Sequence, residues 1–297
     1  MKVTSLGAVG GMKRLTLTLF GGFEARLSGS EILVLPRRKA RALLAYLALR
    51  PGLICPREAL MALLWGDVPA EQARHSLRQA LVDLRRALPN GKTPTLLAEG
   101  DSLALKPDRV GVDVGEFEEL ANRSTRKALE RAATLYTGDL LVGLTLREPA
   151  FEDWLRAERI RLRERALHVL RQILALEIAS ADLEPAVQTA LRFLAIEPLS
   201  ESVHRTLIQL YDKLGRRSAA LRQYDYCADL LQRELGVAPE PETRRLYESL
   251  APKARAIAGT YHVKLPRGRD DTFDASLDIS VTPDQAHSDH AGQIDGP

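Results

Sequence analysis

The sequence is poor in the features that mark several large classes of protein. It has only two cysteines, Cys55 and Cys227, too few for a disulfide framework or a cysteine-based metal site. No stretch approaches the roughly 18 continuous apolar residues that a membrane helix needs. The first residues hold a single lysine and an apolar run broken by glycines, too weak for a signal peptide, and Met12 could be the true start. We therefore expect a cytoplasmic protein with no membrane segment.

A catalytic or metal-binding pattern is also missing. The six histidines form no pair at the i, i+4 spacing and no cluster with cysteine. No serine nucleophile elbow and no cysteine–histidine arrangement can be located, and no carboxylate stands out from the others. We therefore expect no metal, no cofactor and no enzymatic activity.

Aromatic residues make up only 5% of the chain, and leucine and alanine dominate, which favours helices. The length of 297 residues suits about two domains. Charge divides between them: residues 1–112 hold 17 basic and 9 acidic side chains, a net charge of +8, and the remainder holds 25 and 30, a net charge of −5. This split suggests that only the first part meets a polyanion.

One basic stretch, Glu71–Leu88, has the pattern of a single amphipathic helix. Its leucines recur at i, i+4, i+7 and i+11 and form one stripe, namely Leu77, Leu81, Leu84 and Leu88. The side chains off the stripe are candidate DNA contacts, namely Arg74, Arg78, Gln79, Val82, Arg85 and Arg86. Such a helix can enter a major groove, where arginine reads guanine or neutralises phosphate. The alternative is a helix with a solvated basic face.

The sequence around this helix predicts a winged helix. Alternation or turn signals predict strands at residues 15–20, 23–27 and 32–35, with a turn at 28–30. Helices are expected at residues 37–49 and 57–65, and Pro89-Asn90-Gly91 ends the basic helix. Short strands at 96–98 and 103–105 read as a hairpin. Strands, three helices and a hairpin are the order of a helix-turn-helix with a wing.

Three segments carry a family resemblance: Arg37 to Ala48, Pro56 to Asp67 with its Leu-Trp-Gly-Asp step, and Leu84 to Leu88. They resemble the OmpR-type winged helix, and more closely its version in the antibiotic-regulatory (SARP) activators. The resemblance implies that Trp65 packs under a loop, with Gly66 and Asp67, that can contact RNA polymerase. Ala80 and Val82 stand where the family often has polar residues, which leaves the base preference open.

Arg37, Arg38 and Lys39 form a basic cluster at the start of a predicted helix. A helix N-terminus favours an anion, so the cluster is a candidate phosphate clamp. Two other interpretations stay open: simple solvation, or structural pairing of Arg38 or Arg41 with carboxylates.

From residue 113 the sequence predicts helices with little interruption. We expect one helix over residues 116–135, a turn at 136–141 and a long helix over 151–176, whose Arg159, Arg161, Arg163 and Arg165 resemble a solvated face. Later positions repeat at a spacing of 34 residues: Ile173 with Leu207, Leu176 with Leu210, Ala186 with Ala220 and Val187 with Leu221. This period is typical of tetratricopeptide-like helix pairs.

The segments Asp113 to Phe117, Tyr136 to Leu141 and Leu235 to Thr243, in that order, resemble the bacterial transcriptional activator domain that follows the SARP winged helix. We therefore expect a mainly α protein: a flexible leader (1–14), a winged-helix DNA-binding domain (15–112), a tetratricopeptide-like domain (113–252) and a disordered acidic tail (253–297).

The leading functional hypothesis is a sequence-specific transcription activator that binds repeats in double-stranded promoter DNA as a homodimer and contacts RNA polymerase. The main alternative is a protein-interaction scaffold in which the winged helix is a protein contact. A third hypothesis is an enzyme with an N-terminal regulatory domain, but the sequence shows no catalytic motif that would support it.

Overall fold

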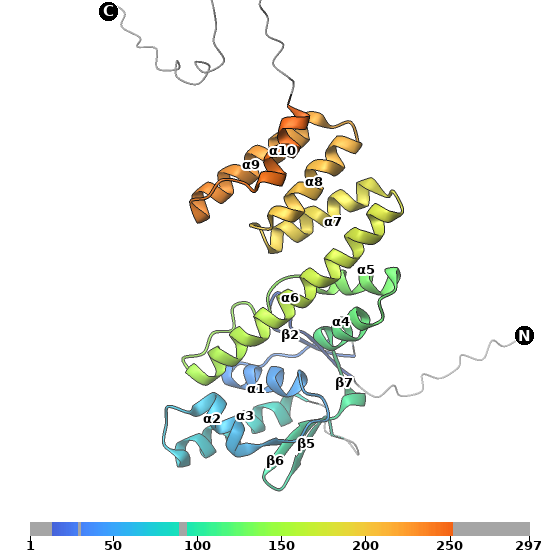
Figure 1. Ribbon diagram of the computed structural model, residues 1–297. Coiled ribbons are helices and arrows are strands. Elements are labelled where there is room, and N and C mark those ends of the chain that lie inside the picture. Colours follow the sequence, from blue (N-terminus) through green and yellow to red (C-terminus); the bar gives the residue numbers. More distant parts are fainter. Residues whose placement is uncertain (1–13, 29–30, 89–93, 252–297) are drawn as a thin grey trace, which may run out of the picture. The chain divides into compact units, whose positions relative to one another are not determined.

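A computed structural model describes residues 14–28, 31–88 and 94–251 (Figure 1). The expected leader (1–14), the helix stop at 89–91 and the expected disordered tail (253–297) lie wholly or almost wholly outside these residues, as does most of the turn at 28–30. The described chain as far as Leu250 forms one compact unit. Within the described part, no helix combines the length and apolar content that crossing a bilayer requires.

The first hundred residues have the predicted order of strands, three helices and a hairpin. The elements are β1 (Leu15–Thr18), β2 (Glu24–Leu27), β3 (Glu31–Ile32), α1 (Arg38–Ala48), β4 (Cys55–Pro56), α2 (Arg57–Trp65), α3 (Ala70–Ala87), β5 (Leu96–Glu99), β6 (Ser102–Leu105), the 3-10 turn η1 (Pro107–Arg109) and β7 (Val110–Val112). In β1, Leu15 and Leu17 are buried and alternate with exposed threonines, as expected of a strand with one face on the core.

Two strands that the sequence did not predict complete the sheets. β7 pairs in parallel with β1 and gives the order β3-β2-β1-β7, and β4 pairs with β6 and gives a three-stranded wing, β4-β6-β5. Both are too short, at three and two residues, to show an alternating pattern. The strand predicted at 32–35 ends at Ile32; beyond it Leu33 and Leu35 are buried and Val34 is exposed, so the alternation belongs to an extended segment crossing the core.

The rest of the described chain is helical, which confirms the predicted fold class. The elements are α4 (Asp113–Asn122), α5 (Arg126–Leu135), α6 (Pro149–Ala179), α7 (Leu183–Ile196), α8 (Glu201–Lys213), α9 (Arg217–Leu235) and α10 (Pro241–Leu250). The single helix predicted over 116–135 is wrong. Ser124 has a left-handed backbone with a φ of 52°. The side-chain hydroxyl of Thr125 accepts a hydrogen bond from Ala128 N and so caps the start of α5. A hydroxyl cap breaks the helix at this point.

The 34-residue repeat is visible in the turns as well as in the core. Ala181 and Gly215, 34 positions apart, are both left-handed, with φ of 58° and 71°, and connect α6 to α7 and α8 to α9. Ala186 and Ala220 are both fully buried where helices approach closely. Leu176 departs from the repeat, since it is 40% exposed whereas Leu210 is buried.

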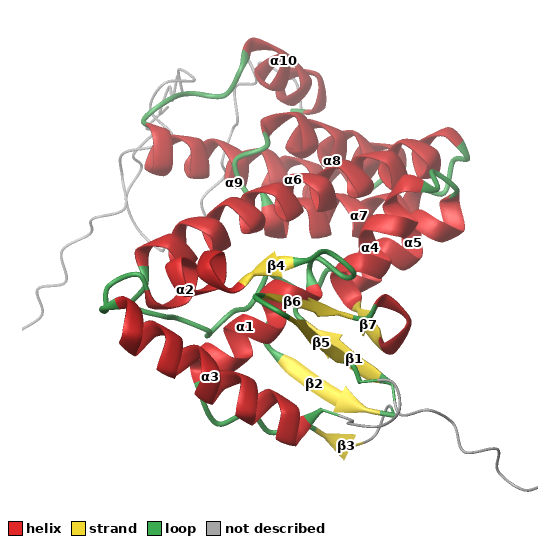
Figure 2. Cartoon of the chain, turned by 90° about the horizontal axis from the view of Figure 1, so that it is seen from below, coloured by secondary structure: helices red, strands yellow, loops and turns green. Residues whose placement is uncertain are grey.

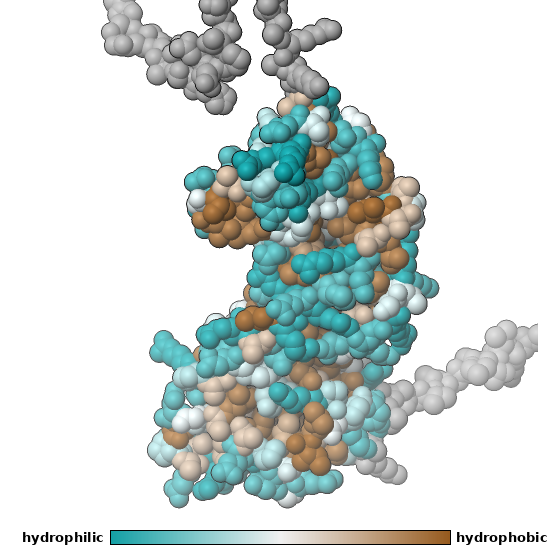
Figure 3. Space-filling model, viewed as in Figure 1, coloured by the Kyte–Doolittle hydropathy of each residue, from teal (hydrophilic) through white to brown (hydrophobic). Residues whose placement is uncertain are grey.

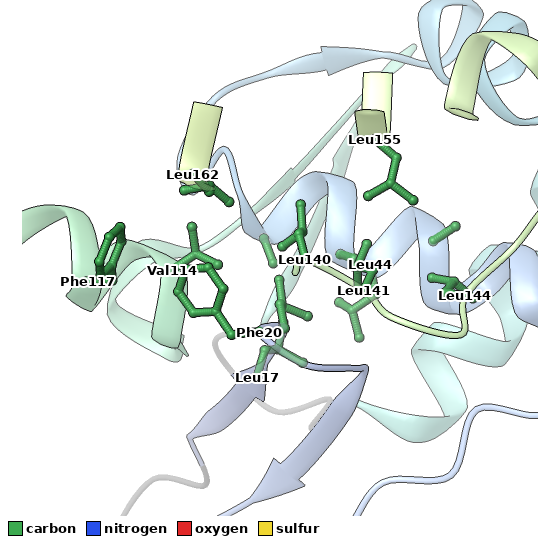
Figure 4. Close-up of a cluster of buried hydrophobic side chains, with 14 of the residues drawn as sticks. Leu17, Phe20, Leu44, Val114, Phe117, Leu140, Leu141, Leu144, Leu155 and Leu162 are labelled. Atoms are coloured by element: carbon green, nitrogen blue, oxygen red, sulfur yellow. The ribbon is translucent and has the colours of Figure 1, made fainter. Parts of the chain in front are cut away.

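A continuous apolar core joins the winged-helix region to the helical region (Figure 4). It includes Leu17 of β1, Phe20 shortly after β1, Leu44 of α1, Phe117 of α4 and Leu155 of α6. The carboxylate of Asp113 supports this junction by accepting bonds from Leu19 N and Phe20 N at 2.9 Å. Burial raises the pKa of the Asp113 carboxyl, although these backbone bonds act in the opposite direction.

The arginines of α6 lie at the surface, with Arg161 exposed and the other three half-buried, but they have partners on other elements instead of forming a purely solvated face. Arg159 donates to the carbonyls of Leu140 and Leu141, at 2.7 and 3.0 Å. Arg161 pairs with Glu118 and Glu158. The remaining two reach Ile196 O and Asn122 Oδ1, from Arg163 and Arg165 respectively. Each of the four therefore connects α6 to another helix or loop. The local sequence could not predict this, since these partners are distant in the chain.

Candidate nucleic-acid interface

The basic helix α3 lies on the outer side of the winged-helix region, away from α7 to α10 (Figure 2). Its leucine stripe is buried as predicted, with Leu77, Leu81 and Leu84 at most 2% exposed, and Leu88 caps its end. Ala80 is buried too, so it faces the core and leaves no gap in the outer face where a base contact is expected.

The outer face of α3 carries its basic side chains in two groups. At 3.6 residues per turn, Arg74, Arg78 and Arg85 fall within about 40° of one another around the helix axis, and Arg86 and Gln79 lie about 80–100° further round. All four arginines are exposed, whereas Gln79 and Val82 are half-buried. Arg78 Nε donates to Arg74 O at 3.3 Å, which directs the Arg78 side chain along the helix. The helix thus presents guanidinium groups across a broad arc.

A groove of about 500 Å³ runs between α2 and α3 beside the wing. Arg74 and Arg78 line it from α3, Arg57 lines it from the first turn of α2, and Met61 and Val68 form apolar walls. Arg57 was missed in the sequence. The sequence could have indicated it, because Arg57 directly follows Pro56, which marks the start of the helix that precedes the basic one.

The wing turn carries acidic rather than basic residues. Gly100 adopts a φ of 55°, which suits the tight turn between β5 and β6, and Asp101 beside it is exposed. Asp101 accepts the backbone N–H of Arg57 at 2.9 Å and lies 4.0 Å from its guanidinium. The wing therefore positions Arg57 instead of adding positive charge of its own.

The cluster at the start of α1 separates into different environments. Arg37 Nε lies 3.3 Å from Asp83 of α3. Lys39 Nζ contacts Glu148 at 2.5 Å and lies over the ring of Trp65, so it links α1 to α2 and to the start of α6. Arg38 is exposed and has no ion pair within the described residues. Of the three, Arg38 is the side chain most accessible to a phosphate.

The loop between α2 and α3 has a buried base and an exposed tip. Trp65 is 5% exposed, and its ring packs in the core beneath the loop. Gly66 and Asp67 are exposed. A partner would therefore meet Gly66 and Asp67, while Trp65 holds the loop in place.

Two family models match the chain in the order of these regions. Residues 31–99 match the model described as "Transcriptional regulatory protein, C terminal", and residues 112–251 match "Bacterial transcriptional activator domain". The first match runs from β3 to β5 and so includes α1, α2 and α3, and the second runs from the last residue of β7 to the end of α10. The chain thus has the two-domain composition of a bacterial transcriptional regulator.

The relatives that this chain resembles are regulatory proteins. The chain is 28% identical over 240 residues to the regulatory protein AfsR of Streptomyces coelicolor, covering 77% of this chain but only 23% of that protein. It is 26% identical to the regulatory protein DnrI of Streptomyces peucetius, covering 80% and 92%. With MoaR1 of Mycobacterium tuberculosis the identity is 26%, over 84% and 81%. The chain belongs to the SARP family of bacterial transcriptional regulators.

A solved structure shares the fold. The chain of Mycobacterium tuberculosis EmbR, solved in complex with a low-affinity phosphopeptide, superposes with a TM-score of 0.63 at 23% identity. The match covers 80% of this chain and 65% of that one. It supports the arrangement of a winged helix followed by a helical region.

Proposed function

We propose that this chain is a sequence-specific DNA-binding regulator of transcription. The observation that carries the proposal is the exposed arc of arginines on α3, presented by a winged-helix frame whose leucines are buried. In this proposal α3 enters the major groove of promoter DNA, with Arg74, Arg78, Arg85 and Arg86 at bases or phosphates and Gln79 and Val82 at base edges. Arg57 and Arg38 contact the flanking backbone.

The same proposal assigns Arg37 and Lys39 a supporting role at the DNA backbone or in the frame. Arg37 keeps α1 next to α3 through Asp83, and Lys39 keeps α1 next to α6 through Glu148. Both are close enough to the helix N-terminus to reinforce its attraction for a phosphate. Their ion pairs make the frame role the stronger of the two.

Activation is the proposed outcome of binding. The exposed Gly66 and Asp67 would contact RNA polymerase, and two copies of the chain would bind repeated half-sites as a homodimer. The match to the model described as "Bacterial transcriptional activator domain" supports this direction of regulation.

The test begins with selection of bound sequences from a random DNA pool at a stated salt concentration, which reports the half-site and the repeat spacing together. On the selected duplex, Arg78→Ala should weaken binding by about 1–3 kcal/mol, or about 5- to 160-fold. The matched control is Arg222→Ala on α9, which removes an arginine that is also exposed but lies on another helix. Equal affinity of the Arg78 variant and the wild type would contradict the placement of α3.

Salt dependence separates this function from that of a protein-binding scaffold. Several phosphate contacts make affinity fall steeply with salt, by about 0.9 log units per phosphate for each decade. Failure of the chain to bind heparin or DNA columns at low salt would favour the scaffold.

A further inference from the structure

A second pocket lies in the helical region, and none of its lining residues belongs to the proposed DNA-binding elements. It has a volume of about 300 Å³ and is formed by the end of α5, the loop that follows it, α6 and α7. Alanines at 133, 166 and 195 and the glycine at 138 leave the space open, and Leu170 and Ile196 give it apolar walls. This volume is at the lower end of the range of about 300–1,000 Å³ for ligand sites, which suits a small molecule.

Arg192 is the charged side chain that lines this pocket. One of its terminal nitrogens donates to Ala133 O at 2.8 Å, which holds the side chain across the pocket between α7 and α5. No carboxylate pairs with Arg192 within the described residues.

Neighbouring charges are already engaged. Arg163 pairs with Glu197 at 3.5 Å and donates to Ile196 O. Asp139 accepts the hydroxyl of Tyr136 at 3.1 Å, and burial together with Asp139 raises the pKa of Tyr136 to about 12, which keeps that hydroxyl protonated. The pocket therefore combines an apolar floor, formed by the buried Ala166 and Leu170, with the exposed guanidinium of Arg192 at its mouth, which no acidic side chain neutralises within the described residues.

We propose that this pocket binds a small apolar carboxylic acid. The carboxylate would accept charge-assisted hydrogen bonds from the remaining N–H groups of Arg192, whose planar fork suits a carboxylate. The hydrocarbon part would lie over Ala166 and Leu170, where burial of apolar surface favours binding.

The pocket also touches the connection to the winged helix. Its wall includes Thr137, whose hydroxyl donates to Phe20 O at 3.1 Å directly after β1. Tyr136, from the same wall, packs its ring edge-on to Phe20 with centroids 5.0 Å apart. An occupant would thus contact the loop that fastens the helical region to the β1 sheet, which gives the ligand a route to influence the frame of α3.

The experiment is titration calorimetry of the whole chain with octanoate as the probe and 1-octanol as its neutral counterpart. Octanoate should bind with one site per chain and a Kd of about 1 mM or below, as expected for a ligand of this size. Octanol should bind at least about ten-fold more weakly, because it lacks the charge that Arg192 recognises.

Three variants locate the site. Arg192→Gln should weaken octanoate binding at least about ten-fold, Arg192→Lys should restore part of it, and Ala195→Trp should abolish it by filling the pocket. The controls are Arg222→Gln and Ala179→Trp, which make the same changes at exposed positions elsewhere. Thermal unfolding of every variant verifies the fold.

Absence of saturable octanoate binding, or equal binding by the wild type and the Arg192→Gln and Ala195→Trp variants, would overturn the proposal. Because the titration contains no DNA, its result is independent of the proposed DNA-binding function. A second titration, of DNA affinity with and without octanoate, then measures whether the pocket is coupled to α3.

Discussion

The arginines of α3 and those of α6 look alike in the sequence but differ in their surroundings. Both sets recur on one helix at spacings that suggest a basic face. On α3, Arg74, Arg78 and Arg86 are exposed, and their side chains make no ion pair within the described residues. On α6, Arg159 and Arg161 are held by carbonyls or carboxylates of other elements. Hydrophilic side chains cover much of the helical region in the view of Figure 3, and the contacts of Arg159 and Arg161 mean that such a surface is not by itself evidence of a binding face.

This difference teaches that a charge run has to be judged by its tertiary partners. The acceptors of Arg165 and Arg163 are Asn122 and Ile196, which lie 43 and 33 residues away in the sequence. An arginine with satisfied partners stabilises the protein, whereas an exposed one adds little to stability and remains available to a ligand. The predictions below separate the two roles.

The largest effect is expected at Arg159. In Arg159→Ala the carbonyls of Leu140 and Leu141, both fully buried residues, lose charge-assisted donors. We expect a loss of about 2–3 kcal/mol in the free energy of unfolding, measured by urea denaturation. A loss below about 0.5 kcal/mol would place Arg159 with the exposed arginines. Arg156→Ala, on the same helix but exposed in its pair with Asp153, is the control.

A somewhat smaller effect is expected at Lys39. In Lys39→Met the carboxylate of Glu148, only 7% exposed, loses its cation, and we expect a loss of about 1–2 kcal/mol in the free energy of unfolding. The same variant tests the phosphate-clamp hypothesis. If Lys39 contacts a phosphate, the slope of log K against log salt should shrink by about 0.9.

Arg38→Met is the matched comparison for Lys39. We expect it to leave stability within about 0.5 kcal/mol of the wild type and to reduce the salt slope. If Lys39→Met changes the salt slope and Arg38→Met does not, the assignment of Lys39 to the fold and of Arg38 to the DNA backbone is wrong.

The sequence predicted the elements that depend on local pattern and missed those that depend on distant partners. The leucine stripe of α3 and the helices α1 and α2 follow from periodicity and from prolines and glycines beside them. Strands β4 and β7 could not be predicted, since each is defined by its pairing with β6 or β1 and not by its own residues.

The candidate interface shows the same limit. Exposure of the α3 arginines could be predicted because the buried stripe fixes the opposite face. The pairing of Lys39 with Glu148, 109 residues later, could not. The break between α4 and α5 was within reach, because Ser124-Thr125 is a hydroxyl pair of the kind that begins helices.

We expect the stability of the protein to depend on pH through His204, whose two ring nitrogens both have hydrogen-bond partners. Its Nε2 contacts Pro198 O at 2.8 Å, and its Nδ1 contacts Gln223 Nε2 at 2.7 Å, an arrangement that suits the neutral ring. Burial lowers the pKa of His204, against the opposing influence of Pro198 O and Glu201. Stability from this ring is therefore full above the unfolded pKa of about 6.5 and is lost as pH falls from there through the folded pKa.

His204→Gln should remove this part of the pH dependence. The measurement is urea unfolding of the wild type and the variant between pH 7.5 and pH 5, with His168→Gln, an exposed histidine on α6, as the control. The stability difference between wild type and His204→Gln should narrow as pH falls. A constant difference across this range would show that protonation of His204 is not coupled to folding.

The smallest effect on stability is expected on α3 itself. Arg74→Ala removes an exposed side chain with no ion pair in the described residues, so the free energy of unfolding should change by less than about 0.5 kcal/mol. Alanine also has the higher helix propensity, which offsets part of any loss. If Arg74→Ala nevertheless weakens DNA binding while stability is unchanged, the side chain acts on the ligand and not on the fold. A stability loss as large as that of Arg159→Ala would instead mean that α3 uses its arginines as α6 does.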